Sequence, residues 1–139
     1  MFTCDIPIRF NDVDQARIVY YPHFFHFCHV AMEELFARVV GVPYHELIDR
    51  DGITLPTVHV DGDFSAPVTF GQTLRIGVEL ERMGETSMTF RFTAARTTDE
   101  TVVFRGAVTM VCVRMSDFTP IRLPESYRAA LETLRRTAS

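Results

Sequence analysis

The sequence has no tryptophan, few cysteines and no long apolar run. Its three cysteines, Cys4, Cys28 and Cys112, lack the CxxC spacing of a zinc knuckle and do not indicate a disulfide framework. No stretch reaches the roughly 18 to 20 apolar residues that a membrane span needs. The first five residues have neither the basic region nor the apolar region of a secretion signal. Together these absences predict a cytoplasmic protein without a membrane span.

An excess of basic residues is also missing. The formal net charge is −4, whereas a general nucleic-acid binder needs a basic surface to neutralise phosphates. Hydrophobic residues make up 47% and charged residues 23% of the chain, which is typical of a globular protein. The 139 residues leave room for one domain, predicted over 1–139. Twelve phenylalanines indicate a core built around bulky rings.

A long helix is predicted from residue 22 to residue 40. Pro22 suits the first helical position because its missing N–H has no helical partner there. Gly41, followed by Pro43, is a typical helix stop. At 1.5 Å per residue the helix is roughly 27 Å long. Apolar residues cover almost its whole circumference, which is typical of a buried helix.

Most of the remaining segments predict strands. Apolar alternation and turn residues place them at 2–10, 53–68, 74–80, 88–92 and 102–115, with a short amphipathic helix at 125–136. The predicted order is one strand, the long helix, four strands in a meander and the short helix. This order favours the α+β class, with the helix packed against a mainly antiparallel five-stranded sheet. A single helix cannot cover both faces of such a sheet, so we expect a dimer.

Two acidic residues, Asp12 and Asp14, lie in a polar loop between the first strand and the long helix. The free N–H groups and the positive dipole at a helix start stabilise a developing oxyanion. A carboxylate beside them provides a base or a nucleophile for acyl transfer. Acidic loop residues are also common turn formers, so the residues by themselves leave both interpretations open.

The loop and the start of the helix read FNDVDQARIVYYPHF over residues 10–24. This segment resembles the active-site loop of the 4-hydroxybenzoyl-CoA thioesterase family, and the order of elements agrees from about Ile6 to Val113. The resemblance implies a hotdog fold, in which a curved sheet wraps a long central helix. It also implies an acyl-CoA thioesterase that hydrolyses an aromatic or short-chain acyl-CoA to the free acid and CoA. Coenzyme A is then part of the substrate, and we expect no cofactor.

The resemblance assigns roles to single residues. Asp14 matches the catalytic aspartate, which either attacks the thioester to give an acyl-enzyme anhydride or activates a water. Tyr21 matches the residue whose backbone N–H at the helix start polarises the thioester carbonyl, and Pro22 offers no N–H of its own. Asp12 is expected to order the loop. Arg17 stands where many relatives have glycine, and it either meets CoA phosphates or is an exposed loop residue.

The acyl group cannot be carried over from the resemblance. His29 stands where the hydroxybenzoyl-specific enzyme has an aspartate for the phenolic hydroxyl, and the family's basic turn falls at 82–86, where only Arg82 is basic. His26, His29 and Glu33 share one face of the helix, which either lines the acyl pocket, faces solvent or a dimer partner, or binds a metal. No further ligand completes a tetrahedral set, so we expect no metal.

Two other functions fit the same sequence pattern. In a hotdog dehydratase or hydratase, His29 and Glu33 would form the pair of a histidine base and a carboxylate. In a non-catalytic acyl-CoA-binding protein, Asp14 would only form a turn. We expect a homodimer or a homotetramer.

Overall fold

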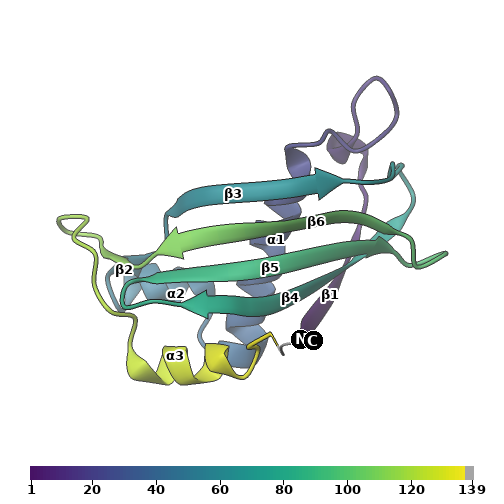
Figure 1. Ribbon diagram of the computed structural model, residues 1–139. Coiled ribbons are helices and arrows are strands. Elements are labelled where there is room, and N and C mark those ends of the chain that lie inside the picture. Colours follow the sequence, from purple (N-terminus) through teal and green to yellow (C-terminus); the bar gives the residue numbers. More distant parts are fainter. Residues whose placement is uncertain (137–139) are drawn as a thin grey trace.

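A sheet and one long helix form the body of the protein (Figure 1). The computed structural model describes residues 1–136. The main sheet has five strands in the order β1-β4-β5-β6-β3, and all neighbours are antiparallel. Their bounds are Phe2–Pro7 (β1), Thr57–Phe64 (β3), Thr73–Met83 (β4), Ser87–Arg96 (β5) and Val102–Val111 (β6). Helix α1 (His23–Leu35) crosses behind this sheet. The hotdog fold predicted from the sequence is confirmed.

The long helix begins and ends close to the predicted residues. It starts at His23, directly after Pro22, and continues beyond Leu35 through a π-helical turn, η2 (Phe36–Val40). Gly41 ends it in the left-handed conformation, with φ of 80°, and its N–H donates to the Phe36 carbonyl oxygen. A residue with a Cβ would be strained in that conformation, and glycine is not.

In the single chain, only one side of helix α1 is buried. The side chains that face the sheet are Phe24, Phe27, Cys28, Ala31, Met32 and Leu35. His26, His29 and Glu33 lie outside this buried set and are exposed. The expectation of a helix buried nearly all round is therefore wrong for the single chain. Among residues 1–136, no helix has the length and apolar character to cross a membrane.

The predicted strand at 53–68 is divided in the structure. Pro56 separates β2 (Ile53–Thr54) from β3, and β2 pairs with β7 (Val113–Arg114) in a small second sheet. Strand β3 lies beside β6 at the edge of the main sheet. Only β4, β5 and β6 therefore form the predicted meander. Apolar alternation reports which face of a strand is buried and contains no information about its neighbour.

Two described helices were not predicted, the short 3-10 helix η1 (Phe10–Asp12) and α2 (Tyr44–Asp49), and the last described helix is shorter than expected. Helix α2 follows Pro43, and α3 (Glu125–Glu132) stops before the predicted end at 136. After α3 the chain pairs with β4: the Leu80 N–H donates to the Leu134 carbonyl at 2.8 Å, and the Arg136 N–H donates to the Leu80 carbonyl at 2.7 Å. This segment covers a stretch of β4 that β1 does not reach.

Phenylalanine rings fill the core between α1 and the sheet, as the composition predicted. Phe36, Phe90, Phe92 and Phe104 are fully buried, and the rings of Phe24 and Phe104 stack at 5.3 Å. The Phe104 ring lies so close to the backbone at Gly106 that a Cβ there would approach it to 2.6 Å.

The two edges of the main sheet differ in character. Strand β1 is short, contains Pro7, and has an ion pair between Asp5 and Arg75 of β4, which are features that discourage edge-to-edge pairing. Strand β3 has eight residues and exposes large apolar side chains: Val58 by 61%, Val60 by 43% and Phe64 by 44%. Of the two edges, β3 is therefore the one better suited to pairing with a strand of another molecule.

Candidate active site

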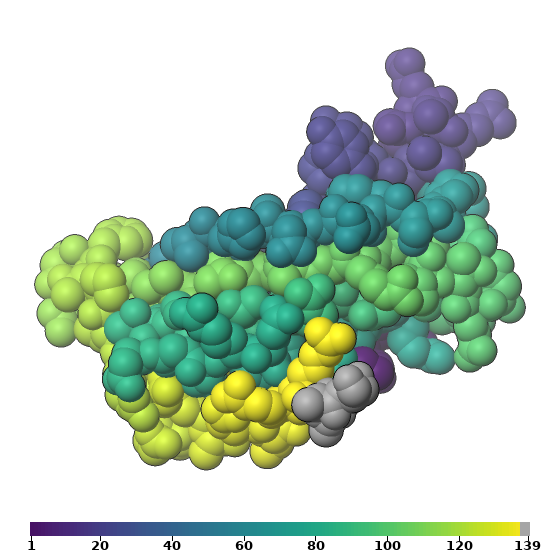
Figure 2. All heavy atoms as spheres, in the orientation of Figure 1, coloured from purple at the N-terminus to yellow at the C-terminus, as the bar shows by residue number. Residues whose placement is uncertain are grey.

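The loop that carries Asp14 stands out from the body of the molecule, as the purple segment of Figure 2 shows. Val13 forms a bridge with Val19, and between them the Asp14 N–H donates to the Ile18 carbonyl at 3.0 Å. The Arg17 N–H donates to the Asp14 carbonyl at 2.9 Å. This tight turn places Arg17 in the left-handed conformation with φ of 67°. That conformation explains why glycine would be favoured at this position.

The Asp14 carboxylate is exposed and held at one oxygen. Its Oδ1 accepts the Ala16 N–H at 2.8 Å, and within residues 1–136 no other group bonds the carboxylate. The side chain lines an open hollow of about 770 Å³ together with Arg17, Phe10 and Phe70. Asp14 thus has one oxygen held by the backbone and a side chain that borders an accessible space.

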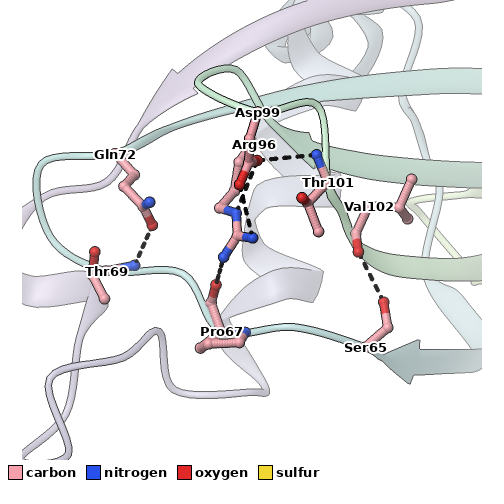
Figure 3. A network of polar contacts seen from close by, with 8 residues as sticks. All are labelled: Ser65, Pro67, Thr69, Gln72, Arg96, Asp99, Thr101 and Val102. Atoms are coloured by element: carbon pink, nitrogen blue, oxygen red, sulfur yellow. Dashed lines mark hydrogen bonds and ion pairs between the residues drawn. The ribbon is translucent and has the colours of Figure 1, made fainter.

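A second loop, residues 65–72, forms the opposite wall of this hollow and is anchored to the sheet (Figure 3). Arg96 at the end of β5 donates from Nη1 to the Pro67 carbonyl at 2.9 Å and also pairs with Asp99. The loop contacts the Asp14 hairpin directly, since the Val19 N–H donates to the Val68 carbonyl at 2.9 Å. The sheet therefore supports the site through Arg96.

The helix start leaves a backbone donor available at Tyr21. The His23 and Phe24 N–H groups donate to the Tyr20 and Tyr21 carbonyls, at 2.8 and 3.2 Å. Within residues 1–136, no backbone or side-chain acceptor takes the Tyr21 N–H. Tyr21 borders a different hollow from Asp14, shared with Phe24 and Phe64. In the described chain the two predicted catalytic residues therefore line different hollows.

Asp12 holds the loop to the helix. It is the one buried polar or charged residue in the described chain, with 8% exposure. Its Oδ2 accepts the Arg9 N–H at 2.7 Å, and its Oδ1 lies 2.9 Å from Nε2 of His23. The sequence interpretation gave no role to His23, because helical spacing reveals neighbours along the helix and not contacts to the preceding loop.

The predicted helix face divides into two parts. His29 borders a cavity of about 240 Å³ between α1 and the sheet, lined mainly by apolar side chains such as Met32, Phe92 and Met110. Glu33 pairs with His29 at 3.6 Å and is exposed. His26 lies instead beside the His23 ring, with centroids 5.0 Å apart. In the described chain no three His, Cys, Asp or Glu side chains are grouped to hold a metal ion.

Two neutral groups flank His29. The Tyr44 ring meets the His29 ring edge-on at 5.6 Å, and burial raises the pKa of Tyr44 to about 12. Burial also raises the pKa of the Cys28 thiol, which lines the same cavity, to about 12. Both side chains therefore stay protonated near neutral pH, and Cys28 is a poor nucleophile because only the thiolate reacts.

Two arginines from elsewhere in the chain lie at the turn between β4 and β5, in addition to Arg82. Arg122 pairs with Glu85 at 2.9 Å, and Arg128 donates to the Gly84 carbonyl at 3.1 Å. Both arginines come from the C-terminal segment, about 40 residues away, so the local sequence around Arg82 gave no sign of them.

Comparison with known proteins identifies the family. Residues 8–131 match the family model described as the Thioesterase-like superfamily. The chain belongs to this superfamily. The match covers most of the chain and includes both the Asp14 loop and α1.

Individual relatives of this thioesterase-like protein agree with that assignment. A 1,4-dihydroxy-2-naphthoyl-CoA hydrolase from Nostoc punctiforme is 30% identical over 137 residues, covering 99% of this chain and 90% of its own. A solved thioesterase-superfamily structure from Jannaschia sp. CCS1 is 26% identical, with TM-score 0.88 over 98% of this chain and 94% of its own. The hydrolase relatives confirm the predicted class of enzyme, a thioester hydrolase.

A third relative supports the fold. The crystal structure of a 1,4-dihydroxy-2-naphthoyl-CoA thioesterase from Synechocystis has TM-score 0.88 and covers 96% of both chains at 22% identity. The narrower 4-hydroxybenzoyl-CoA thioesterase family stays a prediction.

Proposed function

We propose that the protein hydrolyses an aryl-CoA thioester to the free acid and CoA, with Asp14 as its catalytic carboxylate. The observation that carries this proposal is the exposed Asp14 side chain. One of its oxygens is held by the Ala16 N–H, and the side chain borders an open hollow. Membership of the thioesterase-like superfamily supports the reaction class.

Two routes use the same groups. In one, an Asp14 oxygen bonds to the carbonyl carbon as the C–S bond breaks, and water then cleaves the resulting anhydride. In the other, Asp14 removes a proton from a water that attacks the carbonyl carbon. In both, CoA leaves as a thiolate and takes up a proton. The unpaired Tyr21 N–H would stabilise the carbonyl oxygen as charge develops on it.

The cavity beside His29 is the proposed acyl compartment. Its volume of about 240 Å³ exceeds the roughly 150 Å³ of an apolar cavity known to hold benzene. An aromatic ring with substituents therefore fits. His29, supported by Glu33, would bond a hydroxyl group on that ring at the cavity edge. The hydroxylated two-ring acyl group in the names of the hydrolase relatives has this character.

We also propose that the active protein is a homodimer joined along β3. Asp14 and Tyr21 border separate hollows in one chain, so a partner chain is needed to complete a site. The exposed apolar side chains of β3 favour pairing at that edge. Arg17, at the Asp14 hollow, would contact the CoA phosphates. The cytoplasmic location stays a prediction from the sequence.

The decisive experiment is Asp14→Asn, assayed by release of free thiol from a panel of aryl- and short-chain acyl-CoA substrates. We expect turnover of at least one aryl-CoA and a loss of at least about 100-fold in the variant, because an amide is neither a base nor a nucleophile. Asp49→Asn, at an exposed position in α2, is the matched control and should keep full activity.

The outcomes separate the alternatives. Near-native turnover by Asp14→Asn would contradict the proposed mechanism. Interconversion of enoyl-CoA and hydroxyacyl-CoA without thiol release would identify a hydratase. The three cysteines are free and buried, so the protein's own thiols should add little background to the assay.

A further inference from the structure

Asp12 is buried although burial of a carboxylate is costly unless it is paired and hydrogen-bonded. Its polar contacts come from three different parts of the chain. The Arg9 N–H follows β1, the Tyr20 N–H donates to the Asp12 carbonyl at 3.1 Å, and His23 opens α1. Asp12 therefore joins the end of the first strand, the end of the Asp14 loop and the first turn of the helix.

His23 is held in place on the helix side of this contact. Its ring packs edge-on against the Phe27 ring at 5.4 Å and lies 5.0 Å from the His26 ring. These contacts direct Nε2 towards Asp12 Oδ1, at 2.9 Å. This close contact joins the loop directly to the helix start that carries the Tyr21 N–H.

We propose that Asp12 and His23 form a positioning pair that sets the Asp14 loop against the N-terminal end of α1. Neither residue contacts the substrate: both Asp12 oxygens are occupied within the protein, and His23 faces the loop. The pair acts through the loop: the Val19 N–H bond to the Val68 carbonyl ties the loop to residues 65–72, and the Asp12–His23 contact adds the link to the helix start that carries the Tyr21 N–H. This inference rests on the proposed catalytic role of Asp14.

Two substitutions at His23 test the proposal. His23→Phe keeps a ring of similar shape beside Phe27 and removes the ring nitrogen that contacts Asp12, whereas His23→Gln keeps a side-chain nitrogen of similar reach. His45→Phe, at an exposed position in α2, is the matched control. Hydrogen exchange of the amides in residues 9–20 reports loop order without any turnover, and kcat and KM are measured with an aryl-CoA.

We expect His23→Phe to exchange the 9–20 amides at least tenfold faster and to lose at least tenfold in kcat, with KM changed less than threefold. His23→Gln should retain most of both properties, and the control should match the unmodified protein. If His23→Phe does not fold, Asp12→Asn replaces it. The asparagine amide oxygen can still accept the Arg9 N–H, whereas the negative charge beside His23 is removed.

Unchanged exchange in the loop, or a His23→Gln variant no better than His23→Phe, would overturn the inference. Its failure is distinguishable from failure of the proposed function. A fully active Asp14→Asn variant would show that Asp14 is not catalytic. The hydrogen-exchange rates would still report whether the Asp12–His23 pair orders the loop.

Discussion

Arg17 adopts a backbone conformation that residues with a Cβ rarely take. Its φ is 67°, and its side chain lines the hollow of Asp14. The left-handed conformation costs a non-glycine residue roughly 1–2 kcal/mol. We expect its cation to contribute to substrate binding.

Arg17→Gly tests that contribution. We expect the KM for an acyl-CoA to rise about threefold to tenfold, because a cation that pairs with phosphate is lost. The free energy of unfolding should be unchanged or rise by about 1 kcal/mol as the strain is relieved. A pantetheine thioester, which lacks the nucleotide phosphates, should keep its KM. Glu100→Gly, with φ of 59°, is the control, and an equal change for both substrates would contradict the phosphate contact.

His29 provides a test of specificity at the same scale. It is about half exposed, as is Glu33, its ion-pair partner, and exposed pairs contribute little to stability. His29→Ala should therefore leave the melting temperature within about 2 °C of the unmodified protein. It should lower kcat/KM for a hydroxylated aryl-CoA relative to the unsubstituted aryl-CoA by about tenfold, since one hydrogen bond is lost. An unchanged substrate ranking with a sharp fall in melting temperature would make His29 structural.

At the scale of elements, the pairing of β3 with β6 depends on close approach at two glycines. A Cβ on Gly106 would lie 2.4 Å from the Asp61 carbonyl oxygen, and a Cβ on Gly62 would lie 2.6 Å from the Phe104 ring. The first of these neighbours is backbone, so it cannot move without shifting β3. The edge strand and the core ring are thus packed together at this point.

Gly106→Ala should lower the free energy of unfolding by about 2 kcal/mol, the typical cost of overpacking. Gly77→Ala in β4 is the matched control, since its Cβ would meet only the flexible end of the Met1 side chain. We expect a loss below about 0.5 kcal/mol there, because alanine is otherwise favoured over glycine in a strand. Urea unfolding measures both, and equal losses would contradict the packing argument.

The elements that the sequence predicted best have strong local signals. Pro22 and Gly41 mark the limits of the long helix, and the alternation in 74–80 lies inside β4. Helix α2 was missed because six residues with one buried side chain, Leu47, give no helical period. The position of β3 beside β6 was missed because strand pairing is set by contacts distant in sequence.

For the whole molecule, the sequence contained the ingredients of the site but not their arrangement. The Asp14 loop and the Tyr21 helix start were predicted from one continuous segment. Their separation into two hollows depends on how loop 65–72 and β3 pack against that segment. The Asp12–His23 contact likewise depends on the angle at which the loop enters the helix.

Val58→Lys tests whether a partner completes the site. Val58 is exposed at the β3 edge, and a charged side chain on an edge strand, lysine especially, discourages pairing with another strand. We expect sedimentation velocity to show a shift from dimer to monomer and turnover to fall at least tenfold. Phe118→Lys, at an exposed turn far along the chain, should change neither. A fully active monomer would show that one chain is sufficient.

The difference between the two edges of the sheet also bears on how many copies of the protein can pair through them. Strand β1 is blunted by Pro7 and by charge, and the 134–136 segment occupies the free stretch of β4. If only the β3 edge can pair, each copy takes part in one edge-to-edge pairing. A two-fold arrangement, in which β3 of one copy pairs with β3 of the other, uses the free edge of both copies. If the proposed β3 pairing forms, we therefore expect assembly to stop at two copies. A free peptide with the Thr57–Phe64 sequence should prevent dimer formation, because it would pair with the same β3 edge.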